Sequence, residues 1–218
     1  MPKVISSKEA AQLLKPNNRI CFGGFLAVGC AENIIDAIIE AQINDLHMIV
    51  IASDYENRGV GKLIVNKLIK SAQVSHLGTN KAIQEQMNKG EIDIEMVPQG
   101  TLMERVRATG AGLGGILTPT GVDTIVEKDK EKFNINGKDF ILEKAIESDF
   151  AVIRAYKADK LGNLIYRKTA RNSNPIMAMS AKTTIVEVDE IVEVGNLSPE
   201  EIITPGVFVD YIVVHKEN

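Results

Sequence analysis

The chain has 218 residues, of which 44% are hydrophobic and 25% charged, and its formal net charge is -4. This composition is ordinary for a globular protein and excludes collagen-like or disordered chains. With no basic stripe and a negative balance, nucleic acid is not expected as a partner, and a chain of this length can bury a core without disulfides.

The few cysteines and histidines argue against a disulfide framework and against a metal site. Cys21 and Cys30 form no C-x-x-C pair, and His47, His76 and His215 are scattered. The N-terminal segment is amphipathic and does not resemble a signal peptide, and no apolar run approaches the ~18 residues of a membrane helix. We therefore expect a reduced, cytoplasmic protein with no metal and no membrane contact.

The first predicted strand, residues 19–24 ("RICFGG"), ends in a glycine turn. An amphipathic helix is predicted directly after it, because apolar residues recur with helical spacing at Ala31, Ile34, Ile35, Ile38 and Ile39. The run "LHMIVIA" (46–52) is almost continuously apolar, as strands of parallel sheets are. A third strand is predicted at 71–77 and a helix at 83–88.

The next predicted elements are a strand at 94–100 and a helix at 101–109, with Thr101 as N-cap and Glu104 completing a capping box. Asn136-Gly137 lies between two alternating runs, which predicts a two-residue β-hairpin turn. Further strands are predicted at 150–156, 183–188 and 210–214. A helix is predicted at 174–182, with Asn174 as N-cap and Pro175 in its first turn.

The alternation of strands and helices predicts an α/β fold with an open, largely parallel sheet, flanking helices and an antiparallel hairpin excursion. No internal repeat or low-complexity linker divides the sequence. Residues 1–218 are therefore expected to form a single domain.

Three glycine-rich stretches are candidate ligand sites: residues 23–29 ("GGFLAVG"), Gly59 with Gly61, and residues 109–121. We expect all three at the carboxyl ends of strands, where open α/β sheets bind ligands. No lysine follows Gly29 as in a P-loop, and "GAGLGG" closes no predicted strand-to-helix turn, so a nucleotide fingerprint is poorly supported. Amides at the start of the following helix would favour an anionic or carbonyl ligand, partly offset by Glu32.

No complete catalytic site is visible in the sequence. There is no G-x-S-x-G motif and no carboxylate pair suited to a catalytic dyad. Cys30 lies near a helix N-terminus, which can lower a thiol pKa, but no histidine is near it in sequence. Cys21 is predicted to be a small core residue.

Several segments together resemble the alpha subunit of family I (3-oxoacid type) coenzyme A transferases. They follow the family order and cover nearly the whole chain: "GGFLAVG" (23–29), "VPQGTLMERVRATGAGLGG" (97–115), "LTPTGVDT" (117–124), "NPIMAMSAKTTIVEVDEIVE" (174–193) and "ITPGVFVDYIV" (203–213). Within the family, the acetate/butyrate–acetoacetate subset is most similar. The resemblance implies a fold shared with sugar-phosphate isomerase-like proteins.

The resemblance also implies the reaction. Coenzyme A would move from a short-chain acyl-CoA of butyryl, acetyl or acetoacetyl type to a free short-chain carboxylic acid, by a ping-pong mechanism with a covalent glutamate. In the family that glutamate belongs to a Ser-Glu-Asn-Gly motif on the beta subunit, which this chain lacks. We therefore expect no catalytic residue here, a beta-subunit partner in an αβ or α2β2 assembly, and no cofactor, since the coenzyme A thioester is a substrate.

The resemblance assigns coenzyme A contacts to the turn formed by Gly23, Gly24, Phe25, Leu26, Ala27, Val28 and Gly29. It assigns the active-site lining to Gln99, Gly100 and Gly112, with Gln99 facing the partner's glutamate. The chain departs from the family pattern at Cys30-Ala31, where Thr-Pro is usual, in the acidic loop 54–56, which often faces the acyl pocket, and at Thr109, which replaces a glycine.

Two alternatives use the same fold. One is a non-catalytic ligand-sensing module, as in sugar-responsive regulators, but the chain has no room for a DNA-binding helix-turn-helix. The other is a sugar-phosphate isomerase-like protein, which would need a base beside a phosphate loop, and the sequence shows none.

Overall fold

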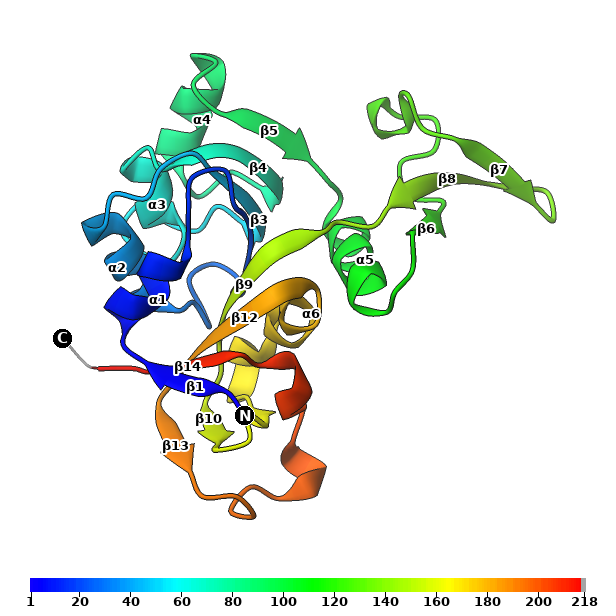
Figure 1. Cartoon of the computed structure of the whole chain (residues 1–218). Helices are drawn as coiled ribbons and strands as arrows, with labels where there is room; N and C mark the ends of the chain where they lie inside the picture. Colours follow the sequence, from blue (N-terminus) through cyan, green and yellow to red (C-terminus); the bar gives the residue numbers. More distant parts are fainter. Residues whose placement is uncertain (217–218) are drawn as a thin grey trace.

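The computed structural model describes residues 1–216. Its centre is a sheet of eight parallel strands (Figure 1). In spatial order these are β1 (Lys3–Ile5), β14 (Tyr211–Val214), β12 (Ala181–Val188), β9 (Ser148–Arg154), β2 (Arg19–Phe22), β3 (Leu46–Ala52), β4 (Ile69–His76) and β5 (Asp93–Met96). Every neighbouring pair in this sheet is parallel. The predicted open, largely parallel sheet is confirmed.

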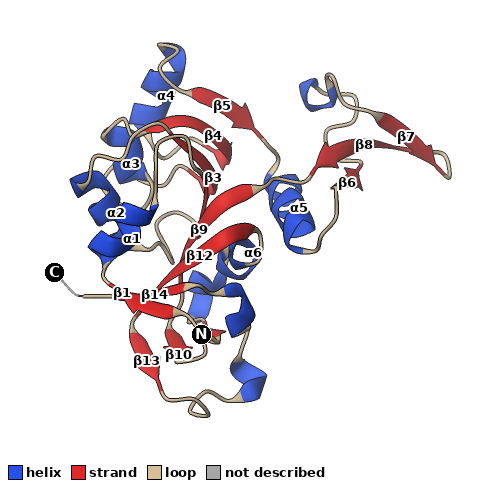
Figure 2. Ribbon diagram, viewed as in Figure 1, coloured by secondary structure: helices blue, strands red, loops and turns tan. Residues whose placement is uncertain are grey.

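Helices cover both faces of the sheet, as Figure 2 shows. One face carries α1 (Ser7–Leu13), α2 (Glu32–Glu40), α3 (Gly61–Val65) and α4 (Lys81–Asn88), and the other carries α5 (Gln99–Gly110) and α6 (Asn174–Ala178). This double cover explains why β3 is buried on both faces and almost continuously apolar. None of these helices, within residues 1–216, has the length and apolar character needed to cross a bilayer.

Two small sheets lie outside the main one. The antiparallel sheet of β6 (Gly115–Thr118), β8 (Lys138–Lys144) and β7 (Lys132–Ile135) extends away from the molecule as an arm (Figure 1). Its turn has Asn136 at φ 51° and Gly137 at φ 80°, which confirms the predicted hairpin. The second sheet joins β10 (Lys157–Asp159), β11 (Leu164–Ile165) and β13 (Glu190–Val192).

Short 3₁₀ helices complete the chain at Ile125–Glu127, Lys168–Arg171, Pro199–Glu201 and Gly206–Phe208.

Two predicted N-caps are wrong, and one predicted helix is too long. α5 begins at Gln99, directly after Pro98, so Thr101 lies inside the helix and its buried hydroxyl has no hydrogen-bond partner among the described residues. α6 begins at Asn174, so Ser173 occupies the N-cap position. The helix ends at Ala178 and not at residue 182 as predicted. The side chain of Asn174 does not cap this helix, because it bonds to other parts of the chain.

The strand order places a topological switch point at the centre of the sheet. From β2 the chain proceeds through β3 and β4 to β5 on one side, whereas from β9 it proceeds through β12 to β14 on the other. A crevice therefore opens outside the carboxyl ends of β2 and β9, where ligands bind in open α/β sheets.

Candidate functional site

A pocket of about 510 Å³ occupies this switch point. It is lined by residues 27–30 after β2, 154–156 at the end of β9, residues 166–170, and the side chains of Glu32, Asp189 and His215. The glycine turn that the sequence singled out therefore forms one wall of the pocket. No three His, Cys, Asp or Glu side chains within residues 1–216 are grouped to hold a metal ion.

The glycines of this turn are required by contacts within the chain itself. A Cβ added at Gly23 would lie 1.8 Å from Asn174 Oδ1, and one at Gly24 would lie 2.4 Å from Cys30 Sγ. At Gly29, which has φ +76°, the added atom would lie 2.7 Å from the carbonyl oxygen of Ala170. The turn's bare backbone thus makes room for neighbouring protein atoms.

Most amides of the turn are already used. Phe25 and Val28 exchange backbone hydrogen bonds of 3.1 and 3.0 Å, and Leu26 and Ala27 between them are left-handed, at φ 48° and 63°. The amide of Gly24 donates to Ser173 Oγ at 3.2 Å. Within residues 1–216, the amides of Leu26 and Gly29 have no hydrogen-bond acceptor. Gly23 and Gly24 are buried, whereas residues 25–29 of the turn are half-buried or exposed.

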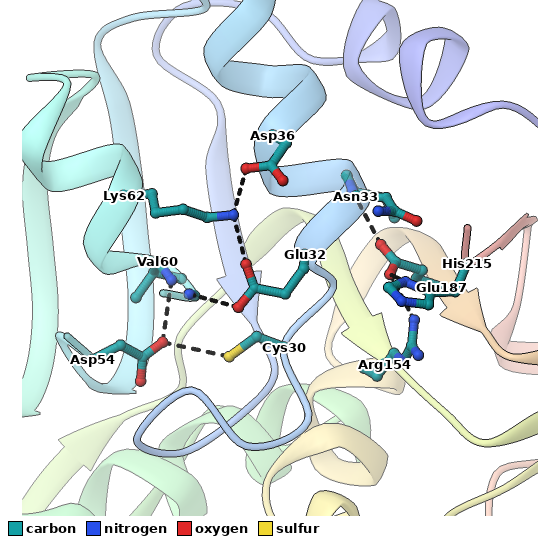
Figure 3. Close-up of polar contacts among 12 residues, drawn as sticks. Cys30, Glu32, Asn33, Asp36, Asp54, Val60, Lys62, Arg154, Glu187 and His215 are labelled. Atoms are coloured by element: carbon teal, nitrogen blue, oxygen red, sulfur yellow. Dashed lines mark hydrogen bonds and ion pairs between the residues drawn. The ribbon is translucent and has the colours of Figure 1, made fainter. Parts of the chain in front are cut away.

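Asp54, which follows β3, holds the glycine turn in place, and Gly59 of the second glycine stretch makes room for it. Asp54, 1% exposed, accepts hydrogen bonds from the amide of Ala27 at 2.9 Å and the amide of Val60 at 3.1 Å. The thiol of Cys30 lies 3.4 Å from the same carboxylate (Figure 3). Gly59 allows this packing, because its Cβ would lie 2.1 Å from Asp54 Oδ2. Asp54 thus positions the turn, and it does not line the pocket at the switch point.

The cysteines have structural environments. Burial and the neighbouring Asp54 carboxylate raise the pKa of the Cys30 thiol well above its usual range, which opposes the reactivity that a helix N-terminus can give. Cys21 is fully buried in the core, as predicted, and burial raises its pKa as well. Neither thiol has the character of a nucleophile.

The Asp54 carboxyl makes stability depend on pH. Burial raises its pKa above the usual value for an aspartate, although the hydrogen bonds from Ala27, Cys30 and Val60 lower it. The folded state therefore binds this proton more tightly than the unfolded chain. The contribution to stability is greatest below the unfolded-state pKa and is lost as the pH rises through the folded-state value.

We expect the unfolding free energy of wild type, relative to Asp54→Asn, to fall from about pH 3.5 upward and level off at neutral pH. Urea denaturation across this range measures it, with the exposed Asp93→Asn as matched control. A difference that is flat, or that rises with pH, would contradict the assignment.

A protein carboxylate fills the N-terminus of α2, where an anionic ligand was expected. Glu187 of β12 is fully buried and accepts a hydrogen bond from the amide of Ile34 at 3.0 Å. Its other contacts are Arg154 Nη1 and His215 Nδ1, each at 2.6 Å (Figure 3). The helix dipole is thus satisfied within the chain, and the pocket lies beside this cluster.

Sequence reasoning assigned Glu187 no role, although a charged residue in an otherwise apolar strand run ("TTIVEV") was a usable signal.

Asn172, Ser173 and Asn174 tie the segment after β11 to the glycine turn. Asn172 Nδ2 donates to the carbonyl of Val28 at 2.9 Å, and Ser173 Oγ lies 3.2 Å from both the amide and the carbonyl of Gly24. The fully buried Asn174 donates from Nδ2 to Gly29 O at 3.0 Å and to Ala170 O at 2.8 Å. The two walls of the pocket therefore form one connected unit.

The structure does not bring the other predicted site residues to this pocket. Gln99 and Gly100 are exposed at the start of α5, which follows the edge strand β5. β5 is the third strand from β2 in the sheet, so the two strands are about 14 Å apart. Their role in lining an active site stays a prediction.

Gly112 follows the C-terminal end of α5, at the opposite end of the sheet from the glycine turn. There Thr109 donates to Ile146 O at 2.6 Å, and a Cβ on Gly110 would lie 2.7 Å from Met179 O, next to the amino ends of β9 and β12. Placing the third glycine stretch at carboxyl strand ends was therefore wrong. The reason is that α5 runs antiparallel to the strands and returns the chain to their amino ends. The role of Gly112 in lining an active site stays a prediction.

The glycine packing gives a direct test. We expect Gly23→Ala to destabilise the fold by about 1–3 kcal/mol, because its methyl group overlaps Asn174 Oδ1. Gly100→Ala is the matched control, since an added Cβ there meets nothing within 4 Å. Replacing this helical glycine with alanine should stabilise the fold by at most about 1 kcal/mol. Urea unfolding compares them, and equal stability of the two variants would contradict the packing.

Comparisons with known proteins agree with the fold and with the matched segments. A family profile described as Coenzyme A transferase matches residues 4–215. The acetate CoA-transferase subunit alpha of Escherichia coli (strain K12) is 42% identical over 216 residues, covering 99% of this chain and 98% of the relative. The acetoacetyl-CoA:acetate/butyrate CoA transferase alpha subunit of Clostridium acetobutylicum is 41% identical over 211 residues, with 97% of each chain covered.

The fold is similar to a crystal structure of an acyl-CoA transferase from Escherichia coli O157:H7 in a thioester complex with CoA. The TM-score is 0.87 at 22% identity, and the alignment covers 98% of this chain but 47% of that one, so this chain spans about half its length. The matches do not favour a ligand-sensing module or a sugar-phosphate isomerase. The chain belongs to the coenzyme A transferase family, whose enzymes are transferases.

Proposed function

We propose that the chain is the alpha subunit of a coenzyme A transferase that exchanges coenzyme A between a short-chain acyl-CoA and a free short-chain carboxylic acid. The observation that carries the proposal is the pocket at the switch point, which lies within the region that the family profile matches and has the family's glycine turn as one wall. The names of similar proteins specify acetate, butyrate, acetoacetyl-CoA and 3-ketoacids. Acids of this size and type are the proposed substrates.

The attacking carboxylate is proposed to come from a beta subunit. Two carboxylates line the pocket, and each is held in an ion pair: Glu32 with Lys62, and Asp189 with Arg154. A carboxylate held by a cation is a poor nucleophile. The naming of the relatives as alpha or A subunits supports the need for a second chain. An αβ or α2β2 assembly is proposed on the same ground.

In this mechanism the partner's glutamate attacks the thioester carbonyl and expels the coenzyme A thiolate, leaving an acyl-glutamyl anhydride. The thiolate then attacks the glutamyl carbonyl, releases the acyl group as a carboxylate and forms a glutamyl-CoA thioester, which the second acid reverses. No metal or cofactor is proposed, since one CoA thioester is consumed and another is formed. The proposed part of this chain is to hold coenzyme A, with the amides of Leu26 and Gly29 at the tip of the turn as hydrogen-bond donors.

The test compares the purified chain with a coexpressed complex of this chain and a beta subunit. We expect no acyl exchange from the chain alone, and exchange from the complex over a panel of acetyl-, butyryl- and acetoacetyl-CoA with free acids. Borohydride should inactivate the complex only after acyl-CoA is added, because it reduces the glutamyl thioester. Robust exchange by the chain alone, or a complex without exchange on any pair, would refute the proposal.

A further inference from the structure

A basic segment, residues 167–171, lies beside the glycine turn and forms the adjoining wall of the pocket. It follows β11 and includes the 3₁₀ helix Lys168–Arg171. Residues 167–170 line the pocket together with residues 27–30 of the turn. The segment is therefore placed to contact any ligand that the turn contacts.

The two cations of this segment that line the pocket, Arg167 and Lys168, have no partner charge. Arg167 and Lys168 are exposed, and neither forms an ion pair with another residue of the described chain, 1–216. Arg154, in the same pocket, differs because Glu187 and Asp189 neutralise it. The unpaired positive charge of the pocket is thus concentrated on the basic segment.

The segment is held in a fixed conformation that its own sequence does not favour. Lys168 has φ +52°, a left-handed value that is uncommon for a residue other than glycine. The bonds from Asn172 to Val28 and from Asn174 to Ala170 hold the segment against the turn. A strained, anchored and exposed basic segment points to ligand contact, since it contributes little to the core.

The guanidinium of Arg167 also lies over an aromatic ring, 5.4 Å from the centroid of Tyr156. Stacking fixes the plane of the guanidinium and leaves the N–H groups at its edge available for an anion. Arginine and lysine side chains recognise phosphate oxygens through charge-assisted hydrogen bonds.

We propose that Arg167 and Lys168 bind the phosphate groups of the nucleotide part of coenzyme A. The inference rests on the proposed function and names the residues that recognise the thioester substrate far from its reacting atom. The anionic groups of coenzyme A are phosphates that stay partly hydrated, which suits exposed cations at the mouth of a pocket. The small acyl acids carry one carboxylate that must reach the reacting glutamate, and exposed cations at the rim do not suit that role.

The test uses the complex with the beta subunit and two thioester substrates with the same acyl group, acyl-CoA and acyl-pantetheine, which lacks the phosphates. The double variant Arg167→Gln, Lys168→Gln should lower kcat/KM for acyl-CoA by about ten- to a hundred-fold, since charge-assisted hydrogen bonds are lost. The value for acyl-pantetheine should not change. The exchange Arg167→Lys, Lys168→Arg keeps both charges and should restore most of the activity on acyl-CoA.

Lys89→Gln is the matched control, because this exposed lysine also lacks an ion-pair partner among the described residues and lies outside the pocket. Equal losses on both substrates, or no loss on either, would overturn the inference. Weakened assembly with the beta subunit, seen by gel filtration, would also overturn it, because the cations would then pair with the partner. A wild-type complex without exchange would instead refute the proposed function, so the two failures are distinguishable.

Discussion

Asn174→Ala is expected to lower the stability of the chain by about 3–5 kcal/mol, because it removes a fully buried side chain and leaves partly buried backbone groups without partners. The Asn174 side chain is fully buried. It accepts from the amide of Arg154 at 2.9 Å and donates to the carbonyls of Gly29 and Ala170. Alanine removes all three bonds and opens a space beneath the turn. Urea unfolding or calorimetry measures the loss, which corresponds to roughly 10 °C in Tm for a chain of this size.

The same substitution should impair catalysis in the complex beyond its effect on folding. Asn174 joins the two walls of the pocket, and a displacement of about 1 Å in a binding site can reduce rates by about a hundred-fold. The exposed Asn196→Ala is the control and should leave both stability and exchange unchanged. An Asn174→Ala chain with wild-type Tm and full exchange would show that this side chain is not the connection described here.

Glu187→Ala is the second substitution with a large expected effect, also about 3–5 kcal/mol of destabilisation. It removes a fully buried carboxylate from Arg154, His215 and the amide of Ile34. Arg154, only 16% exposed, would keep Asp189 as its one carboxylate partner within residues 1–216. Breaking a buried pair on one side is costly because the remaining charge stays desolvated. Urea denaturation measures the loss of unfolding free energy.

The control for Glu187 is a nearby exposed pair. Glu190 is 55% exposed and pairs with Lys157 at 2.6 Å, so Glu190→Ala should cost at most about 1 kcal/mol. Glu187→Gln keeps the shape and an acceptor for the Ile34 amide and should lie between the two. If the Glu187 and Glu190 substitutions cost the same, the buried cluster does not stabilise the start of α2.

Elements with strong periodicity could be predicted from sequence. The helix after the glycine turn, the apolar strand 46–52 and the Asn136-Gly137 hairpin all formed where expected. In each, the signal lies within a few residues of chain, so local propensity and burial pattern agree. Helix starts were less secure: a capping pattern at Thr101 was overruled because β5 ends at Met96 and α5 begins at Gln99, with Pro98 at its N-cap position.

The polar connections around the pocket could not be predicted. Asn174 meets Gly29 across 145 residues of sequence, Glu187 meets Ile34 across 153, and Asp54 meets Ala27 across 27. No local pattern encodes such pairs, because they exist only once β12, β9, β2 and β3 lie side by side. The sequence indicated that something approaches the backbone closely at Gly23, Gly24 and Gly29, but only the tertiary contacts showed that protein atoms occupy this space.

The amino-acid sequence by itself determined the α/β class, the parallel sheet and, through its matching segments, the coenzyme A transferase family. These depend on periodicity and on motifs, which are properties of the linear chain. Only the tertiary structure decided which amides of the glycine turn remain available, that Asp54 supports the turn, and that Arg167 lies beside it. The physical reason is that hydrogen-bond satisfaction and burial depend on which distant segments meet, and the folded sheet sets that arrangement.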